Sequence, residues 1–340
     1  MTVKTLAGAL GVSPSTISNA YNRPDQLSAH LRERILAKAT ELGYAGPDAA
    51  GRTLRVGRAD AVGVLLGERL SFAFSDPFYI EFLTGVSQVA EQHDISIVLM
   101  PLAQEADNGA LTSIRQASID AMAVLCVPVD HPAIAVARIR AIRLVTTDAD
   151  PDPTTAWVAI DEERAGFLIG THLTALGHRD VTVVLDSNRP PGTEPVVITA
   201  EDVHLPHSRA RLTGLRRAIS GTVTLVSTGH NSIPSGHSAG RWLTQAGDPP
   251  TAIVALSDVL ALGVLDALEE GGFVTPADIS VCGFDDVPAA AAADLTTIRQ
   301  PILERGREIG RLLLDAESQP RQVMLPVQLV VRATTGRARG

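Results

Sequence analysis

The sequence predicts a small all-α head followed by an α/β core of two doubly wound parallel-sheet lobes. Residues 1–46 contain three short amphipathic helical segments and no strand-like run. From residue 61 onward, short apolar runs alternate with helical stretches. About nine such runs suit two parallel sheets with helices on both faces, and 340 residues are enough for two or three cores.

The first two helical segments have the signals of a helix-turn-helix. Thr2 can cap the first helix, in which apolar residues recur at positions 3, 6, 7 and 10, and Gly11 ends it. Ser13 and Pro14 then supply a capping hydroxyl and a proline at the first position of the second helix. Two short helices joined by a short turn that contains glycine are typical of this motif.

The second helix exposes an unusual face. Its outer side carries four short hydrogen-bonding side chains at helical spacing, namely Ser15, Ser18, Asn19 and Asn22. A solvated helix usually exposes charged residues, whereas Asn can pair bidentately with adenine and Ser with several base edges. The alternative interpretation is that these residues only cap and terminate a short helix. A third helix from Ser28 to a stop at Gly43 completes the head.

Residues 47–58 are predicted to form a hinge. Gly46 and Pro47 interrupt the chain, and the next segment has a helical start but no apolar face that could hold it on a core. Leu54 lies near Arg52 and beside Arg55, and an apolar wedge with basic neighbours suits insertion into the minor groove of DNA. The alternative is a plain linker with an incidental leucine.

The charge distribution agrees with DNA binding by the head. The whole chain has a formal net charge of −9, yet residues 1–58 carry eight basic and four acidic side chains. A basic head on an acidic body is expected when only the head contacts phosphates. A chance asymmetry is the alternative.

Composition also indicates the compartment. The longest apolar runs are shorter than the roughly 18 residues of a membrane span, and the first residues lack the apolar stretch of a signal peptide. The two cysteines, Cys126 and Cys282, lie in or beside apolar runs, as buried thiols of a reducing compartment do. The sequence therefore predicts a cytoplasmic protein with no membrane partner.

In the body of the chain, polar residues follow the ends of several predicted strands. The predicted strands are 61–66, 95–100, 121–125, 143–147, 157–160, 181–185, 222–227, 252–256 and 280–284. The predicted helices include 79–92, 109–117, 162–176, 208–219, 236–246 and 258–270. Ligands of such folds bind beyond the carboxyl ends of the strands. The polar residues at these ends, at positions 148, 161, 186, 257, 258, 285 and 286, therefore predict a polar cleft.

The head and hinge resemble those of the LacI/GalR family of transcriptional regulators. The segments that carry the resemblance are 3–7 (VKTLA), 11–22 (GVSPSTISNAYN), 32–35 (RERI), 42–44 (LGY) and 47–54 (PDAAGRTL). The resemblance implies that Leu54 enters the minor groove and that the major groove is contacted by Ser15, Thr16, Ser18, Asn19 and Asn22. The remaining expected contacts to double-stranded DNA are Thr5, Ser13 and Arg52.

The body resembles the effector-binding core of the same family, which is itself similar to periplasmic sugar-binding proteins. The matching segments are 75–78 (SDPF), 176–179 (LGHR), 211–215 (RLTGL), 257–263 (SDVLALG), 280–286 (SVCGFDD) and 295–301 (LTTIRQP). By position, the resemblance implies that a sugar or nucleoside-like effector contacts Asp76, Phe78, Asp148, Arg211, Asn231, Ser257, Asp258 and Asp285. The arginine would donate to ligand oxygens and the aspartates would accept from hydroxyls. Surface ion pairing is the alternative for each of these residues.

The resemblance also implies a domain organisation. A head at 1–46 and a hinge at 47–58 precede an effector-binding and dimerisation core at 59–340. Within the core, the expected lobes are about 59–158 with 290–321, and about 159–289 with 322–340. The Pro-rich stretch 186–208 is read as an irregular insertion beside the pocket.

Two other functions compete with this interpretation. Residues 236–240 (GHSAG) match the Gly-x-Ser-x-Gly nucleophile elbow of α/β hydrolases. However, no predicted strand leads into the motif, and no histidine follows Ser238 along the chain. Ser235 is therefore read as a helix cap, and no catalytic residue is predicted. A solute-binding protein would share the body, but the basic head and the absence of a signal peptide oppose that function.

The sequence predicts no metal site and no cofactor. Histidines 204, 207, 230 and 237 lack cysteine or clustered carboxylate partners along the chain, and no phosphate-binding Gly-x-x-x-x-Gly-Lys segment is present. The expected protein is a homodimeric repressor of a near-palindromic operator, not an enzyme. Its effector would change the angle between the lobes and thereby the spacing of the hinges. The effector, the direction of its effect, the operator and the regulated genes stay open.

Overall fold

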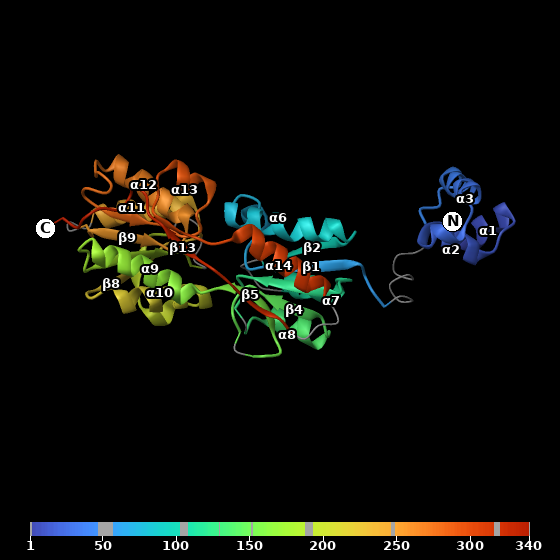
Figure 1. The fold of residues 1–340 in the computed structure, drawn as a ribbon, viewed down its shortest axis with the longest axis horizontal. Coiled ribbons are helices and arrows are strands. Elements are labelled where there is room, and N and C mark those ends of the chain that lie inside the picture. Colours follow the sequence, from blue (N-terminus) through green and yellow to red (C-terminus); the bar gives the residue numbers. More distant parts are fainter. Residues whose placement is uncertain are drawn as a thin grey trace. The chain divides into compact units, whose positions relative to one another are not determined.

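The computed structural model describes residues 2–46, 57–102, 108–128, 130–150, 152–187, 193–245, 249–315 and 320–339. The chain divides into two units, residues 1–59 and residues 60–340. The first unit contains the head, and the second is the core, whose two lobes are labelled in Figure 1 by their strands and helices.

The head is a bundle of three short helices. They are α1 (Val3–Leu10), α2 (Pro14–Asn22) and α3 (Ala29–Glu41), with a 3-10 turn η1 (Pro24–Gln26) before α3. Each helix begins after the predicted cap, since the hydroxyls of Thr2, Ser13 and Ser28 accept backbone N–H groups of the first turns. The buried core comprises Leu6, Ala7, Ile17, Ala20, Ile35, Ala39 and Tyr44. The predicted helix-turn-helix is therefore confirmed.

The first lobe of the core is built on a six-stranded parallel sheet. Its strands lie in the order β12 (Gln322–Leu325), β5 (Ala156–Ile160), β4 (Arg143–Thr146), β3 (Ala121–Leu125), β1 (Ala61–Leu66) and β2 (Ser96–Pro101). Its helices are α5 (Leu70–Ala73), α6 (Pro77–Gln92), α7 (Asn108–Gln116), α8 (Pro132–Ile139) and α14 (Ile302–Leu314). The winding direction reverses between β1 and β3, which is where such sheets bind ligands.

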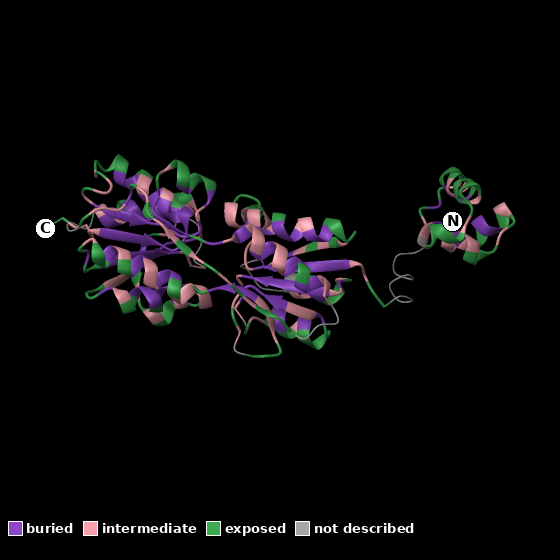
Figure 2. Ribbon diagram, in the orientation of Figure 1, coloured by how far each residue is buried: buried purple, intermediate pink, exposed green. Residues whose placement is uncertain are grey.

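This sheet is covered on both faces. All six residues of β1 are buried, as expected for a strand with helices on either side. On one face, Phe82 of α6 and Ile309 of α14 pack in one cluster with Val64 of β1. Figure 1 shows α8 on the opposite side of the sheet. In Figure 2 the inner strands are mostly purple, and green residues mark the outer sides of the helices.

The second lobe contains a five-stranded sheet. Its strands lie in the order β10 (Ser280–Cys282), β9 (Ala252–Ala255), β6 (Val181–Leu185), β8 (Val223–Ser227) and β7 (Val196–Ile198), of which only β7 is antiparallel to its neighbour. Its helices are α9 (Glu162–Ala175), η2 (Ala200–Asp202), α10 (Pro206–Ala218), α11 (Ile233–Gln245), α12 (Asp258–Glu270) and α13 (Pro288–Ala292). Val183 packs in the cluster with α9 and α10, whereas Val184 packs in the cluster with α11 and α12.

The structure moves two predicted lobe boundaries. The strand β12 was expected in the second lobe, but it pairs with β5 in the first sheet. Conversely, the part of α13 from residue 290 onward and β11 (Thr297–Arg299) were expected in the first lobe. Ala290 of α13 instead packs in a second-lobe cluster, and β11 pairs antiparallel with β13 (Gln328–Val330). The chain therefore returns to the first lobe after β11 rather than at residue 290.

The stretch 186–208 is more regular than its composition predicts. Within its described part, β7 extends the second sheet at its edge, and η2 follows with Thr199 and Asp202 forming a capping box. Short elements of this kind give no periodic signal, because three residues are fewer than one helical turn and barely one strand repeat.

Candidate functional site

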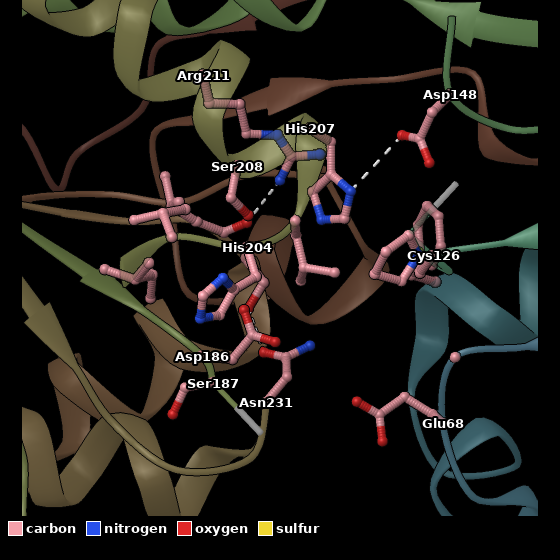
Figure 3. A pocket seen from close by; sticks show the side chains of 18 of the residues that line it. Glu68, Cys126, Asp148, Asp186, Ser187, His204, His207, Ser208, Arg211 and Asn231 are labelled. Atoms are coloured by element: carbon pink, nitrogen blue, oxygen red, sulfur yellow. Dashed lines mark hydrogen bonds and ion pairs between the residues drawn. The ribbon is translucent and has the colours of Figure 1, made fainter. Parts of the chain in front are cut away.

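A polar cavity lies between the two lobes of the core. Its volume is about 330 Å³, and residues from both lobes line it. Several of them follow the carboxyl ends of strands: Glu68 after β1, Asp148 after β4, Asp186 after β6 and Ser257 after β9. Figure 3 shows the first three of these side chains, together with the labelled side chains of α10, around a common space. The arrangement is the one expected for two doubly wound sheets that face each other.

The structure brings seven of the eight predicted effector residues to this cavity. They are Asp76, Phe78, Asp148, Arg211, Asn231, Ser257 and Asp285. The eighth, Asp258, lies behind the wall: its side chain is fully buried and accepts hydrogen bonds from the Val287 N–H (2.9 Å) and the Thr297 hydroxyl (2.6 Å). Burial raises the pKa of Asp258 to about 7. The Asp258 side chain therefore links the start of α12 to the start of α13 and to β11, and it does not line the cavity.

Other polar residues of the core cap helices or form ion pairs. Asp161 accepts the Arg164 N–H at the start of α9, at 2.8 Å. Asp76 caps α6 by accepting the Phe78 N–H, at 2.8 Å, and still lines the cavity. Asp286 pairs instead with Arg299 and Arg332. Being at the end of a strand thus does not by itself distinguish a cap from a ligand contact.

Arg211 is held by its own lobe. Its Nε donates to Glu162 (2.7 Å) and its Nη1 to the Leu256 carbonyl (2.8 Å), while its guanidinium lies over the Phe284 ring at 3.4 Å. Only 8% of the residue is exposed. Burial works against its charge, but Glu162 keeps the pKa of Arg211 above its ordinary value. Arg211 therefore forms a rigid part of the cavity wall.

Polar contacts join the two lobes across the cavity. Asn231 of the second lobe donates from Nδ2 to Asp76 of the first at 3.0 Å, and its Oδ1 accepts the Ser257 hydroxyl at 2.6 Å. His207 Nδ1 lies 3.6 Å from Asp148 Oδ1, a second pair between the lobes. A ligand that enters here must exchange these contacts for its own.

Several lining residues were missed by the sequence analysis. Glu68, His131, His204 and His207 all line the cavity. Glu68 lies two residues beyond β1, so the rule about strand ends would have found it. The histidines lie in loops or at helix starts, and no sequence periodicity identifies them.

Burial controls the electrostatics of the cavity. It raises the pKa of Glu68 to about 7, helped by the charges of Asp186 and Asp76. It also raises the pKa of Asp76 to about 6, and it raises that of Asp285 well above the ordinary value. Burial acts on Asp148 in the same direction, but hydrogen bonding and charge from His207 keep the pKa of Asp148 below its ordinary value.

The predicted DNA-contacting residues lie mainly on α2 and the turn before it. Ser15 is exposed, and Thr16, Ser18 and Asn19 are partly exposed. Asn19 donates to Gln26 of η1 at 3.2 Å. Thr5 is exposed on α1 and hydrogen-bonds to Thr2. The side chain of Asn22 and the whole of Arg52 and Leu54 lie outside the described residues.

Ser13 combines capping with a predicted DNA contact, whereas Ser28 only caps. Replacing either by Ala is expected to destabilise the head by about 1 kcal/mol, because each hydroxyl satisfies a backbone N–H. Of the two variants, only Ser13→Ala is expected also to weaken DNA binding. Fluorescence anisotropy measures this at temperatures where the head is folded in both variants. Equal affinities for the two variants would show that Ser13 is a cap alone.

The hydrolase motif does not form a nucleophile elbow. Residues 236–240 lie inside α11, which begins at Ile233, several residues after β8 ends. Ser238 donates back to the Pro234 carbonyl at 2.9 Å, as helical serines do. The expected cap at Ser235 was wrong, since the Ser232 hydroxyl accepts the Ser235 N–H.

Within the described part of the chain, no cluster of three His, Cys, Asp or Glu residues could hold a metal ion. Among the same residues, none of the helices combines the length and the hydropathy of a membrane span.

Comparison with known proteins agrees with this architecture. The model of a periplasmic binding protein-like domain matches residues 171–335. An HTH-type transcriptional regulator of Mycolicibacterium smegmatis is 36% identical over 92% of this chain and 89% of its own length. The crystal structure of a LacI-family regulator from Corynebacterium glutamicum superposes with a TM-score of 0.72 at 29% identity, covering 98% of both chains. The complex of the regulator CelR with cellobiose gives a TM-score of 0.67 at 25% identity, covering 98% of this chain and 99% of the other.

Proposed function

The chain belongs to the LacI family of HTH-type transcriptional regulators, and on that premise we propose that it is a repressor controlled by a small molecule. It binds a near-palindromic operator as a homodimer, with one head on each half-site. The effector is a sugar or nucleoside-like molecule that occupies the cavity between the lobes. We expect it to act in the cytoplasm, where it would meet the DNA.

The observation that carries this proposal is the polar cavity bridged by contacts between the lobes. A ligand can shift a conformational equilibrium only if it binds one state better than the other. Here the Asn231–Asp76 and His207–Asp148 contacts exist only while the lobes are close. A ligand that replaces or reinforces them therefore couples its binding to the angle between the lobes. That the related regulator CelR holds cellobiose supports a sugar as the effector.

Selection of binding sites from random duplex DNA tests the proposal. We expect the full-length protein to enrich an inverted repeat, because a two-fold dimer reads two equivalent half-sites. A thermal-shift screen of sugars and nucleosides should in parallel identify compounds that raise the midpoint with the logarithm of their concentration. Enrichment of a single, non-repeated site would contradict the dimeric arrangement.

Asn19 provides a sharper test on the selected site. Asn19→Ala is expected to weaken operator binding about tenfold, because a bidentate contact to adenine is lost. Thr40 on α3 is exposed and is not among the expected DNA contacts, so Thr40→Ala should leave the affinity unchanged. Gel-shift titrations of both variants measure the difference. Unaltered binding by Asn19→Ala would remove this residue from the reading face.

A further inference from the structure

The cavity between the lobes has an excess of acid. Its described lining contains two arginines, Arg211 and Arg305, against seven carboxylates: Glu68, Asp76, Asp148, Glu162, Asp186, Asp202 and Asp285. Such a cavity repels anionic ligands, because like charges in a partly desolvated space interact strongly.

Both arginines are engaged with the protein itself. Arg211 pairs with Glu162 and donates to the Leu256 carbonyl. Arg305 donates to the carbonyls of Val158 and Thr147 and to the Gln300 side chain. The two arginines thus donate to backbone carbonyls, to one side-chain amide and to one carboxylate, that of Glu162. Most of the other acids therefore keep their negative charge or must take up a proton.

Three of these acids gather at one end of the cavity, and we call them the acidic seat: Glu68, Asp76 and Asp186. Glu68 and Asp76 come from the first lobe and Asp186 from the second. In Figure 3, Glu68 points from its side of the cavity toward Asp186 and Asn231. Burial is the largest cause that raises the pKa of Glu68, and the charges of Asp186 and Asp76 are the next. The three acids therefore interact electrostatically.

Glu68 also has an unsatisfied oxygen. Its Oε2 is inaccessible to solvent and has no hydrogen-bond partner among the residues that the structure describes. The basic group paired with it, His230 Nδ1, lies 3.8 Å away, and burial lowers the pKa of His230, which disfavours its charged form. The backbone N–H and the charge of Arg69, the next residue in the chain, act to lower the pKa of Glu68, but burial outweighs them and the Arg69 side chain is exposed. A buried acceptor without a donor costs free energy, so a ligand that donates a hydrogen bond to this atom would bind favourably.

The geometry points to an effector that carries a protonated amine, whose ammonium group occupies the acidic seat. This inference rests on the proposed function of the cavity and names its ligand class: a polyhydroxylated amine, such as an amino sugar. An ammonium group supplies three donors and a positive charge, and it matches both the orphan oxygen and the uncompensated acids. A bare metal ion does not fit, because no three of the described acids, histidines and cysteines converge closely enough to hold one.

Matched ligands test this inference. Full-length protein is titrated calorimetrically with glucose, galactose and mannose, with the 2-amino-2-deoxy form of each sugar, and with the 6-phosphate of each sugar. At least one amine is expected to bind about tenfold or more tightly than its parent sugar, since hydrogen bonds to charged groups are the strong ones. No phosphate is expected to bind. If every parent sugar binds as tightly as its amine, or if no amine binds, the inference is wrong. Failure of the proposed function would show separately, as absence of operator binding.

The substitution Glu68→Gln tests the contribution of the acidic seat separately from the rest of the cavity. This substitution keeps the size of the side chain but removes its charge, so it should weaken binding of the amine about tenfold and leave the parent sugar unaffected. Glu163 lies outside the cavity, in an exposed pair with Arg217, and Glu163→Gln should bind all ligands as the native protein does. The thermal midpoint without ligand shows that Glu68→Gln is folded, and it should rise because repulsion within the seat is relieved. Equal loss of amine and sugar binding would overturn the charge-based assignment.

Discussion

Arg211→Ala is expected to lower the free energy of unfolding of the core by about 3–5 kcal/mol, because it leaves Glu162 as a buried and unpaired charge. The side chains of the pair are only 9% and 11% exposed. The substitution also leaves the Leu256 carbonyl without its donor and removes the contact with the Phe284 ring. Urea denaturation followed by tryptophan fluorescence measures this effect, since both tryptophans, Trp157 and Trp242, lie in the core.

The same pair of helices offers a matched control. Arg217 of α10 pairs with Glu163 of α9, but their side chains are 61% and 42% exposed. Because exposed pairs contribute little, Arg217→Ala should change the free energy of unfolding by about 0–1 kcal/mol. If the two alanine variants were equally stable, burial of the Arg211 pair would not be the cause we assign.

Gly214→Val is expected to destabilise the core by about 3 kcal/mol, because two helix backbones meet at this residue. A Cβ added at Gly214 would lie 1.8 Å from the Glu163 carbonyl oxygen, and one added at Gly166 would lie 1.9 Å from the Arg211 carbonyl oxygen. The helices α9 and α10 would have to separate, which also moves Arg211 away from Glu162. Loss of effector response should therefore accompany the loss of stability.

Thr213 is the natural control for this prediction. It is the preceding residue on α10, it is exposed, and Thr213→Val introduces the same side chain without meeting another helix. Its effect should stay within about 0.5 kcal/mol, as is usual for surface substitutions. Urea denaturation compares the two valine variants directly. A similar loss in both would indicate that valine itself, and not the helix contact, disturbs α10.

The sequence predicted the regular elements well where their signals are local. The strands 61–66, 121–125 and 181–185 and the helix 258–270 have the predicted bounds. The strands β11, β12 and β13 were missed because they are three or four residues long and pair with partners distant in sequence. The helix α14 was also missed, although Ile302, Ile309, Leu312 and Leu313 give it an apolar face that periodicity could have revealed.

The candidate site was predictable as a set of strand ends but not as a set of contacts. Asp258 and Asp285 both follow strands, yet only Asp285 lines the cavity, because the first turn of α12 directs Asp258 into the lobe. Arg211 was expected to grip a ligand, and the structure shows that Glu162 and a backbone carbonyl already hold it. Neighbouring residues in the chain thus take different roles that no pattern distinguishes.

By itself, the sequence determined the helix caps and turns of the head, the strand-helix alternation of the core and the family to which the chain belongs. These follow from interactions within a few residues, such as the Ser13–Pro14 helix start. Only the tertiary structure decided how the lobes meet: Asp76 and Asn231 are 155 residues apart in the chain and 3.0 Å apart in space. It also decided that one buried oxygen of Glu68 has no hydrogen-bond partner among the residues that the structure describes. Burial and pairing depend on what the whole fold places nearby, and local sequence does not carry that information.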